Sequence, residues 1–516
     1  PYERQYRGKK RKAMNITELQ QSYASHPNVE GVCRLLKDNS VRHLYCGGLY
    51  ASAASLFSSV LVQRATCPLV FILGDMEEAG YFYHDLTQIL GTEQVLFFPS
   101  SFRRAIKYGQ KDAANEILRT EVLSRLQKGE EGLCVVTYPD ALAEKVVSRK
   151  ELGENTLKLH AGERVDMNFV TDVLRSYGFE YVDYVYEPGQ YAVRGSIIDV
   201  FSFSSEYPFR IDFFVDEVES GRTFEVETQL SKEKKESIVI VPDLSHSLEK
   251  KGSGGMVSFL DFLPSDSLLA MRDFLWLRER IQTVHDESLT PQAIAARESE
   301  ENGAITLEGK LIDGGEFTLR ALDFRRMEFG NKPTGTPDAT VSFHTTVQPI
   351  FHKNFDMVAE SFREYLSRHY TIYICSDSLK QTDRIRAIFE DRGDNISFTA
   401  VERTLHEGFA DDTLRICVFT DHQLFDRFHK YNLKSDKARS GKVALSLKEL
   451  NQFTPGDYVV HTDHGVGRFA GLVRIPNGDT TQEVMKIVYQ NEDVVFVSIH
   501  SLHKVSKYKG KEGEAP

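Results

Sequence analysis

A chain of 516 residues is too long for a single hydrophobic core, and roughly three to five domains are expected. Apolar residues make up 41% and charged residues 27% of the sequence, which is typical of soluble globular proteins. The net charge of −12 argues against a protein that coats DNA, because such proteins neutralise phosphates with lysine and arginine. No stretch reaches the roughly 18 consecutive apolar residues of a membrane-spanning helix, so no membrane partner is expected.

The start of the chain and its cysteines indicate a cytoplasmic protein. Residues 1–13 are basic, but no apolar stretch follows them, so they do not form a secretory signal. Met14 resembles a natural start, and the fold prediction begins there. The six cysteines include no Cys-x-x-Cys pair, and four lie in or beside apolar runs, so we expect reduced, buried thiols.

The first part of the chain alternates short apolar strands with amphipathic helices. Strands are predicted at His43–Cys46, Leu69–Leu73, Val95–Phe98 and Leu133–Tyr138, and helices after Gly47-Gly48, at 76–90 and at Lys111–Gln127. This alternation predicts a parallel sheet with crossover helices.

Four further segments follow in chain order. A helix at Val165–Tyr177 leads into strand-rich sequence of period two, and Ser267–Gln282 reads as a strand followed by a helix. Tyr370–Cys375 and Leu379–Arg392 predict the strand and helix of a second α/β unit. A polar, basic linker then precedes short strands with glycine, proline and asparagine turns at 451–508, which predict a small β-barrel.

The loop after the first strand has the position of a nucleotide-binding loop but not its residues. A phosphate loop reads G-x-x-x-x-G-K-[ST], where backbone amides cradle the phosphates and the lysine neutralises them. Here the degenerate loop carries Gly47, Gly48, Ala51 and Ser52, and no lysine or arginine occurs from Leu44 to Gln63. ATP hydrolysis by this module is therefore not expected, and no catalytic residue is assigned.

Two other polar patterns do not predict a metal site. Asp286 and Glu287 follow a helical stretch rather than an apolar strand, so they are interpreted as a solvated helix end. His461 and His464 flank Asp463 in a glycine turn, which favours a turn role over metal binding. No His-x₃-His or His-Glu-x-x-His pair occurs, and no metal is expected.

A strand predicted within 207–216 has one charged face that also carries an aromatic residue. Period two places Ile211, Phe213 and Val215 on a core face, and Arg210, Asp212, Phe214 and Asp216 on the other. An arginine and a phenylalanine on one solvent-facing side are typical of an interface hot spot, although Phe214 could instead be covered by another element. Arg194 precedes a glycine before the neighbouring strand and could lie near this face.

The stretches Gly189–Phe201 and Tyr207–Ser220, with Phe224 and Thr228-Gln229, resemble a signature shared by UvrB, the damage-loading helicase of excision repair, and the transcription-repair coupling factors. A second pattern separates the two families. Gly456–His461 and His464–Gly471 resemble the RNA-polymerase-interacting domain of the coupling factors, which UvrB lacks. The resemblance spans residues 14–510 and favours the coupling factors.

The resemblance implies a multidomain α/β fold with the following plan. A UvrB-like domain 1a (14–154) comes first, with a degenerate helicase-like parallel α/β fold that binds no nucleotide, and domain 1b (242–345) completes this fold. Between them lies an α+β UvrA-binding domain 2 (155–241). A small linker α/β domain 3 (346–432) and a linker (433–450) follow, and the last part is an RNA-polymerase-interacting domain (451–510) with a Tudor/SH3-like β-barrel. The family's ATP- and magnesium-dependent DNA translocase is expected outside this sequence. No cofactor is therefore expected here, and DNA is a partner only of the full-length protein.

The resemblance also implies partners and the residues that contact them. UvrA contacts fall on Arg194, Arg210 and Phe214. Contact with the RNA polymerase β subunit falls near Ile475, with Arg474 and Leu472 beside it. The expected function is to couple stalled transcription to nucleotide excision repair as a binding platform rather than an enzyme.

Two alternatives remain open. A UvrB-type ATP-dependent repair helicase should carry a phosphate-loop lysine and a long tyrosine-rich hairpin between Phe98 and Lys111, where the segment is too short. The second alternative is a β-barrel that binds peptides or nucleic acid and is attached to unrelated domains.

Overall fold

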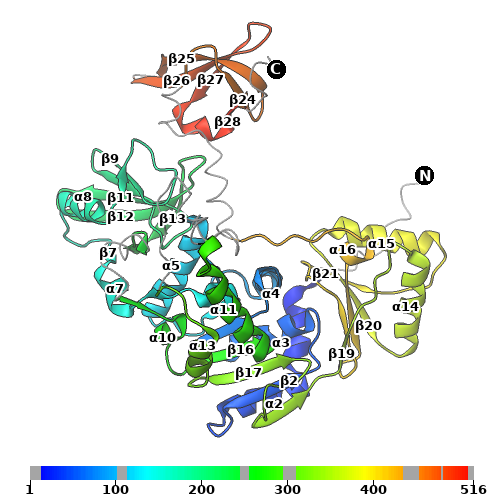
Figure 1. Cartoon of the computed structure of the whole chain (residues 1–516). Coiled ribbons are helices and arrows are strands. Elements are labelled where there is room, and N and C mark those ends of the chain that lie inside the picture. The colour runs from blue at the N-terminus through cyan, green and yellow to red at the C-terminus, as the bar shows by residue number, and fades with distance from the viewer. Residues whose placement is uncertain are drawn as a thin grey trace, which may run out of the picture. The chain divides into compact units, whose positions relative to one another are not determined.

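The computed structural model describes residues 13–101, 113–244, 255–293, 309–433, 453–477 and 480–508 (Figure 1). The chain forms two compact units. The first comprises Pro1–Gln110, Arg125–Val146 and Met256–Leu433, and the second Lys111–Ser124, Val147–Gly255 and Lys434–Pro516. Most of the segment between Phe98 and Lys111, predicted to be too short for a long hairpin, and nearly all of the predicted linker 433–450 lie outside the described residues. Among the described residues, no helix is both long and apolar enough to cross a membrane.

The first unit contains a seven-stranded sheet whose paired strands are all parallel. Its strands, in sheet order, are β18 (Ala339–Ser342), β2 (His43–Gly47), β17 (Arg325–Gly330), β16 (Leu268–Arg272), β3 (Leu69–Ile72), β5 (Cys134–Thr137) and β4 (Val95–Phe98). β3 and β5 are apolar runs that are fully buried, as strands in a parallel sheet covered on both faces must be. The predicted strands and their parallel arrangement are confirmed.

Eight described helices accompany this sheet. They are α1 (Ile16–Ala24), α2 (Pro27–Lys37), α3 (Ala53–Arg64), α4 (Met76–Leu90), α6 (Pro139–Ala143), α10 (Phe259–Phe262), α11 (Phe274–Ser288) and α13 (Gly314–Ala321). Asp75 begins α4 by accepting a hydrogen bond of 2.8 Å from the amide of Glu78, which satisfies one free donor of the first turn. Asp286 and Glu287 lie exposed in the last turn of α11, as the sequence predicts.

A second, six-stranded sheet follows within the first unit. Its strands, in order, are β1 (Met14–Asn15), β21 (Thr399–Glu402), β20 (Thr371–Ser376), β23 (Ile416–Thr420), β22 (Phe409–Asp411) and β19 (Thr345–Val347), with helices α14 (Phe355–Ser367), α15 (Leu379–Asp391) and α16 (Asp421–Leu424). Its core is rich in phenylalanine, including Phe362, Phe389 and Phe419. The start of the chain adds a parallel edge strand here, since Met14 pairs with Val401, a long-range contact that local patterning does not predict.

The second unit contains a mostly antiparallel sheet, with one parallel strand pair at its edge, and a helix. The sheet strands, in order, are β13 (Ser231–Lys235), β12 (Glu217–Phe224), β11 (Phe209–Phe214), β10 (Ile197–Val200), β9 (Gln190–Arg194) and β8 (Glu180–Tyr181); β7 (Leu157–His160) pairs with β14 (Ser237–Ile240), and α8 spans Met167–Ser176. Val170 and Leu174 of α8 pack with Ile198 and Ile211 of the sheet in one core. The remaining elements of the two units are α5 (Ala113–Gln127), α7 (Arg149–Glu154), β6 (Val146–Val147) and β15 (Met256–Val257).

The C-terminal part is a five-stranded antiparallel sheet. Its strands, in order, are β27 (Val494–Ser498), β26 (Thr480–Val488), β25 (Gly465–Asn477), β24 (Tyr458–His461) and β28 (Val505–Lys507), with a 3₁₀ helix, η3, at Ile499–Lys504. Val459, Phe469, Ile487 and Val497 form its core. The short strands predicted for this region are therefore present, and they form an antiparallel sheet.

Candidate functional site

The glycine loop between β2 and α3 is held by a neighbouring backbone segment. The amide of Phe343 donates to the carbonyl oxygen of Gly47 at 2.7 Å, and the amide of Tyr50 donates to Oγ1 of Thr345 at 3.0 Å. Gly48 has φ of +79°, and a Cβ added there would lie 1.9 Å from the carbonyl oxygen of Phe343. Only glycine fits this position, and the reason is close packing of the protein's own backbone.

The first turn of α3 faces a carboxylate of the same chain. Asp85 of α4 is 2% exposed, and its Oδ2 accepts hydrogen bonds from the hydroxyls of Ser52 at 2.7 Å and Ser55 at 2.8 Å. Its Oδ1 accepts one of 2.8 Å from the amide of His406. The N-terminal end of a helix attracts anions, because unpaired amides and the helix dipole leave it partly positive. Asp85 thus supplies a negative charge where a phosphate loop would hold phosphate.

The loop from His406 to Glu407 closes over this turn. The amide of Glu407 donates to Oγ of Ser52 at 3.0 Å, and the amide of Ser52 donates to the carbonyl oxygen of Glu407 at 3.2 Å. Burial raises the pKa of Asp85 to about 6, although the hydrogen bonds from both serines and from His406 oppose that shift. The carboxyl group therefore remains ionised at neutral pH.

A pocket of about 310 Å³ beside Asp85 has more acidic than basic side chains in its lining, since Asp75, Glu77, Glu78 and Glu407 join Asp85 there. Arg272 also lines it, but its guanidinium is paired with Glu78 at 2.6 Å. This charge distribution repels the phosphates of a nucleotide. Gly47, Gly48, Ala51 and Ser52 thus lie between β2 and α3 in an environment that disfavours phosphate.

The three predicted UvrA contacts lie in one antiparallel sheet, but they differ in environment. Arg210 of β11 stands opposite Asp199 of β10, and the two side chains form a bidentate ion pair with distances of 2.7 and 2.9 Å. The side chain of Asp199 is 1% exposed and that of Arg210 is 13% exposed. The guanidinium of Arg210 also lies over the ring of Phe224 at 4.4 Å. The expectation that Arg210 lies on an open solvent face is therefore wrong, because this arginine is needed to neutralise a buried aspartate.

Arg194 is the second cation on Asp199. Its guanidinium pairs with Oδ2 of Asp199 and lies 5.1 Å from the ring centroid of Tyr184. Its side chain is more exposed than that of Arg210, so part of the guanidinium remains available to a partner.

Phe214 is 70% exposed at the end of β11 and is not covered by another described element. The hairpin turns directly after it, because Phe214 pairs with Glu217 and leaves only two residues in the loop. The assignment of Val215 to the core face is wrong: it is 83% exposed with φ of +58°. The period-two pattern fails there because the strand ends at Phe214.

The predicted polymerase contacts lie on the long strand β25. Arg474 is exposed, and Leu472 and Ile475 are half-buried. Leu472 packs against the core of the C-terminal sheet, so it has a structural role as well. Part of the turn after Pro476 lies outside the described residues.

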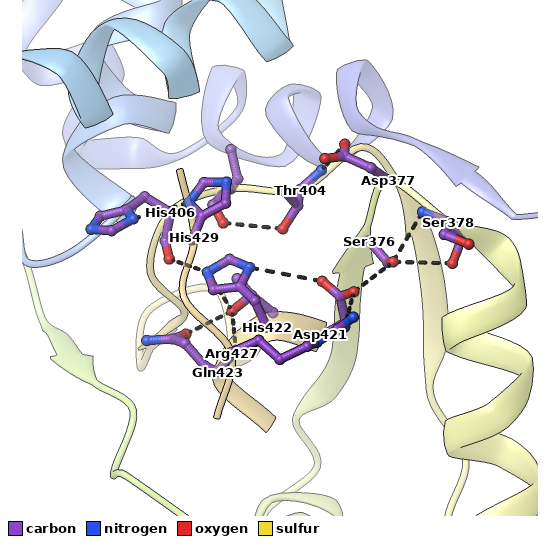
Figure 2. Close-up of polar contacts among 12 residues, drawn as sticks. Ser376, Asp377, Ser378, Thr404, His406, Asp421, His422, Gln423, Arg427 and His429 are labelled. Carbon is purple, nitrogen blue, oxygen red and sulfur yellow. Dashed lines mark hydrogen bonds and ion pairs between the residues drawn. The ribbon is translucent and has the colours of Figure 1, made fainter. Parts of the chain in front are cut away.

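A cluster of histidines was not predicted from the sequence. His406, His422 and His429 each offer a ring nitrogen, and these nitrogens lie within 4.8 Å of one another (Figure 2). Burial and neighbouring histidines lower the pKa of His406 to about 4 and that of His429 to about 3, so both rings are neutral at pH 7. Their spacing matches no local metal-binding motif, because they come from a loop, from helix α16 and from the segment after it.

Comparison with known proteins identifies both parts of the second unit. Residues 157–246 match the UvrB interaction domain family, and residues 453–509 match the CarD-like/TRCF RID domain family. Over 547 residues the chain is 22% identical to a transcription-repair-coupling factor of Bacillus subtilis, and over 533 residues 24% identical to one of Staphylococcus aureus. Each comparison covers 91% of this chain but only 45% of the relative, so the chain spans less than half the length of the relatives it matches.

The chain is thus a multidomain α/β protein with parallel sheets, an antiparallel domain of the UvrB-interaction type and a C-terminal sheet of the RID type. Along most of its length it corresponds to the N-terminal portion of the transcription-repair-coupling factors, which confirms the resemblance found in its sequence.

Proposed function

We propose that this protein couples stalled transcription to nucleotide excision repair by binding UvrA and the RNA polymerase β subunit through separate modules. The observation that carries this proposal is that a UvrB interaction domain and a RID domain occur in one chain. In this proposal UvrA binds within 155–241, and the polymerase binds a Tudor/SH3-like barrel at 451–510. Residues 14–154 and 242–345 together form a degenerate helicase-like scaffold, 346–432 form a second α/β domain, and 433–450 link it to the barrel.

The UvrA surface is centred on Phe214. This aromatic side chain stands exposed at the end of a strand whose neighbouring residues are held by the Asp199 ion pairs. An exposed aromatic side chain on the same sheet as a partly exposed arginine has the composition of an interface hot spot. Arg210 supports this surface mainly through Asp199, and Arg194 offers the more accessible charge.

Titration of purified UvrA into the full chain by calorimetry tests this assignment. We expect Phe214→Ala to weaken binding by about 2 kcal/mol or more, the usual cost of truncating a hot-spot residue. Leu319→Ala is the matched control, because Leu319 is equally exposed at 70% but lies in the other unit. Equal UvrA affinity for the wild type and Phe214→Ala would refute the surface.

The polymerase surface is centred on Ile475 and Arg474 of β25. Ile475 pairs with Gln482 toward the end of the β25–β26 hairpin, away from the core positions of the sheet. We expect Ile475→Arg to reduce retention of the polymerase β subunit in a pull-down, since a charge replaces an apolar contact. Val494→Arg, at an exposed position on edge strand β27, is the control and should bind normally. Equal retention by both variants would contradict the assignment.

The chain by itself is proposed to have no ATPase activity. The loop at Gly47–Ser52 has no lysine, an internal carboxylate faces α3, and the pocket beside it is acidic. ATP-driven DNA translocation is assigned to parts of the relatives that this chain does not match, and with it the roles of ATP, magnesium and DNA. Phosphate release from ATP by the purified chain would instead support the UvrB-type helicase. A cytoplasmic location fits the six free cysteines.

A further inference from the structure

Four histidines of the first unit gather between its two sheets. His84 comes from α4, His406 from the loop after β21, His422 from α16, and His429 from the segment that follows α16. His422 and His429 lie 16 and 23 positions after His406 in the sequence, and the fold brings both beside it. These residues meet because β22 and β23 form an antiparallel hairpin. The segment before β22, which contains His406, therefore lies next to the segment after β23, which contains His422.

The ring nitrogens approach at distances suited to a shared ion. Nδ1 of His406 and Nδ1 of His429 are 3.1 Å apart. Two imidazole nitrogens bound to one tetrahedral zinc ion at 2.0–2.1 Å lie roughly 3.3 Å apart. The rings of His422 and His429 are nearly parallel with centroids 4.2 Å apart, so one of them must turn about its side-chain torsions for both to face one ion.

The tautomer of His422 leaves one nitrogen available. Its Nε2 lies 2.7 Å from the carbonyl oxygen of His406, which can only accept, so Nε2 carries the proton. Its Nδ1 therefore has a lone pair, and this buried atom has no hydrogen-bond partner among the described residues. The carboxylate of Asp421 faces this nitrogen at 3.8 Å, a contact drawn in Figure 2. Ligating histidines commonly donate their second nitrogen to a carbonyl group in this way.

His84 provides a second unpartnered nitrogen at the same place. Its Nε2 is buried without a hydrogen-bond partner among the described residues, and its ring centroid lies 4.8 Å from that of His429. A buried polar atom without a partner is costly, and a bound ion would remove that cost.

We propose that His406, His422 and His429 bind one divalent transition-metal ion of the zinc class, next to His84. Imidazole nitrogens in a partly buried site are suitable ligands for such an ion, and the three ring nitrogens, among them the unpartnered Nδ1 of His422, already lie within 4.8 Å of one another.

The ion would fasten the segment after α16 to α4. The hydroxyl of Tyr81 in α4 already donates to the carbonyl oxygen of His429 at 2.6 Å, and the ring of His406 stacks on that of Tyr81 at 3.5 Å. Gly80 leaves room for the ring of Tyr431, since a Cβ there would lie 2.3 Å from it. Because the amide of His406 also binds Asp85, the ion would hold the loop that covers the first turn of α3.

The test uses the full chain, stripped of metal with a chelator and then titrated with Zn²⁺ or Co²⁺ alone. We expect one ion per chain and a visible Co²⁺ spectrum without the sulfur-to-cobalt charge-transfer band that cysteine ligands would give. His429→Gln should weaken zinc binding by more than the roughly 10- to 100-fold that loss of an outer-shell partner costs. His344→Gln, an exposed histidine of the same unit, should bind like the wild type.

Two results would overturn the proposal. The first is a wild-type chain that binds no Zn²⁺ at micromolar concentrations, or binds Co²⁺ only through cysteine. The second is a His429→Gln chain that binds zinc like the wild type. If circular dichroism showed His429→Gln to be misfolded, the milder His422→Asn would replace it. Zinc binding by His422→Asn at wild-type affinity, or a wild-type Co²⁺ spectrum with a sulfur-to-cobalt band, would then overturn the proposal.

Discussion

The hydroxyl of Ser52 donates a hydrogen bond of 2.7 Å to the carboxylate of Asp85, at the start of the helix that follows the glycine loop. In a nucleotide-binding fold this position faces phosphate. Here a residue of the next helix supplies the negative charge, and the loop at His406–Glu407 covers it. The loss of the phosphate-loop lysine and the gain of an internal anion therefore have the same effect, since both make nucleotide binding unfavourable.

Asp85→Ala should lower the free energy of unfolding by about 3 kcal/mol. The substitution leaves two buried hydroxyls and the amide of His406 without an acceptor, and an unsatisfied buried group costs about 1–3 kcal/mol. Asp85→Asn keeps an acceptor oxygen and should cost less. Urea unfolding of the full chain measures both, and an Asp85→Ala chain as stable as the wild type would show that the carboxylate does not hold the loop.

Gly48→Ala should destabilise the protein by about 2 kcal/mol or more. Alanine is strained at φ of +79°, and its Cβ would overlap the carbonyl oxygen of Phe343. Gly31→Ala is the matched control, because Gly31 lies inside α2 with no atom within 4 Å of an added Cβ. That change should stabilise by about 0.5–1 kcal/mol, since alanine is the better helix former. Similar effects at both positions would contradict the packing argument.

The sheets were predictable because their strands are short apolar runs separated by amphipathic helices, as at Leu69–Ile72 and Val95–Phe98. The glycine loop was predictable because the missing lysine is a local feature. Asp85 was not, because it occupies an ordinary helical position and its partners lie 30 and 33 residues away. The histidine cluster was missed for the same reason.

In the antiparallel sheet of the second unit, the alternation of apolar and polar residues predicts the faces of strand β11 but not the environment of each side chain. Period two correctly places Ile211 and Phe213 in the core, and Arg210 and Phe214 on the opposite face. It does not distinguish an exposed side chain from one held against a buried aspartate, because that depends on the neighbouring strand. The alternation also predicted that the strand continues through Val215, although the hairpin turn begins there. Neither glycine nor asparagine marks this turn in the sequence.

Asp411 should make the first unit sensitive to acid. Burial alone would raise its pKa, but the ring of His26, 3.5 Å away, and hydrogen bonds from the amide of Leu414 and from Tyr23 outweigh burial and hold the pKa below its usual value. A carboxyl group with a lowered pKa stabilises the fold above its unfolded pKa of about 3.9, and this stabilisation is lost as pH falls through the folded value. Asp411→Asn should therefore be less stable than the wild type at pH 7, with a gap that narrows below about pH 4. Thermal unfolding across this range measures the gap, and a constant difference would contradict the role of this charge.

Arg210→Glu and Phe214→Ala should both impair UvrA binding, but only the first should damage the fold. Arg210→Glu removes a cation from Asp199, which is 1% exposed, and brings a second carboxylate beside it. Removing one partner of a buried ion pair typically costs about 3–5 kcal/mol. Phe214 is 70% exposed, so its truncation should change stability by less than about 0.5 kcal/mol. Thermal unfolding and UvrA titration of the two single variants separate these effects. An Arg210→Glu chain with wild-type stability would mean that Arg194 alone neutralises Asp199, and that Arg210 is free to contact a partner directly.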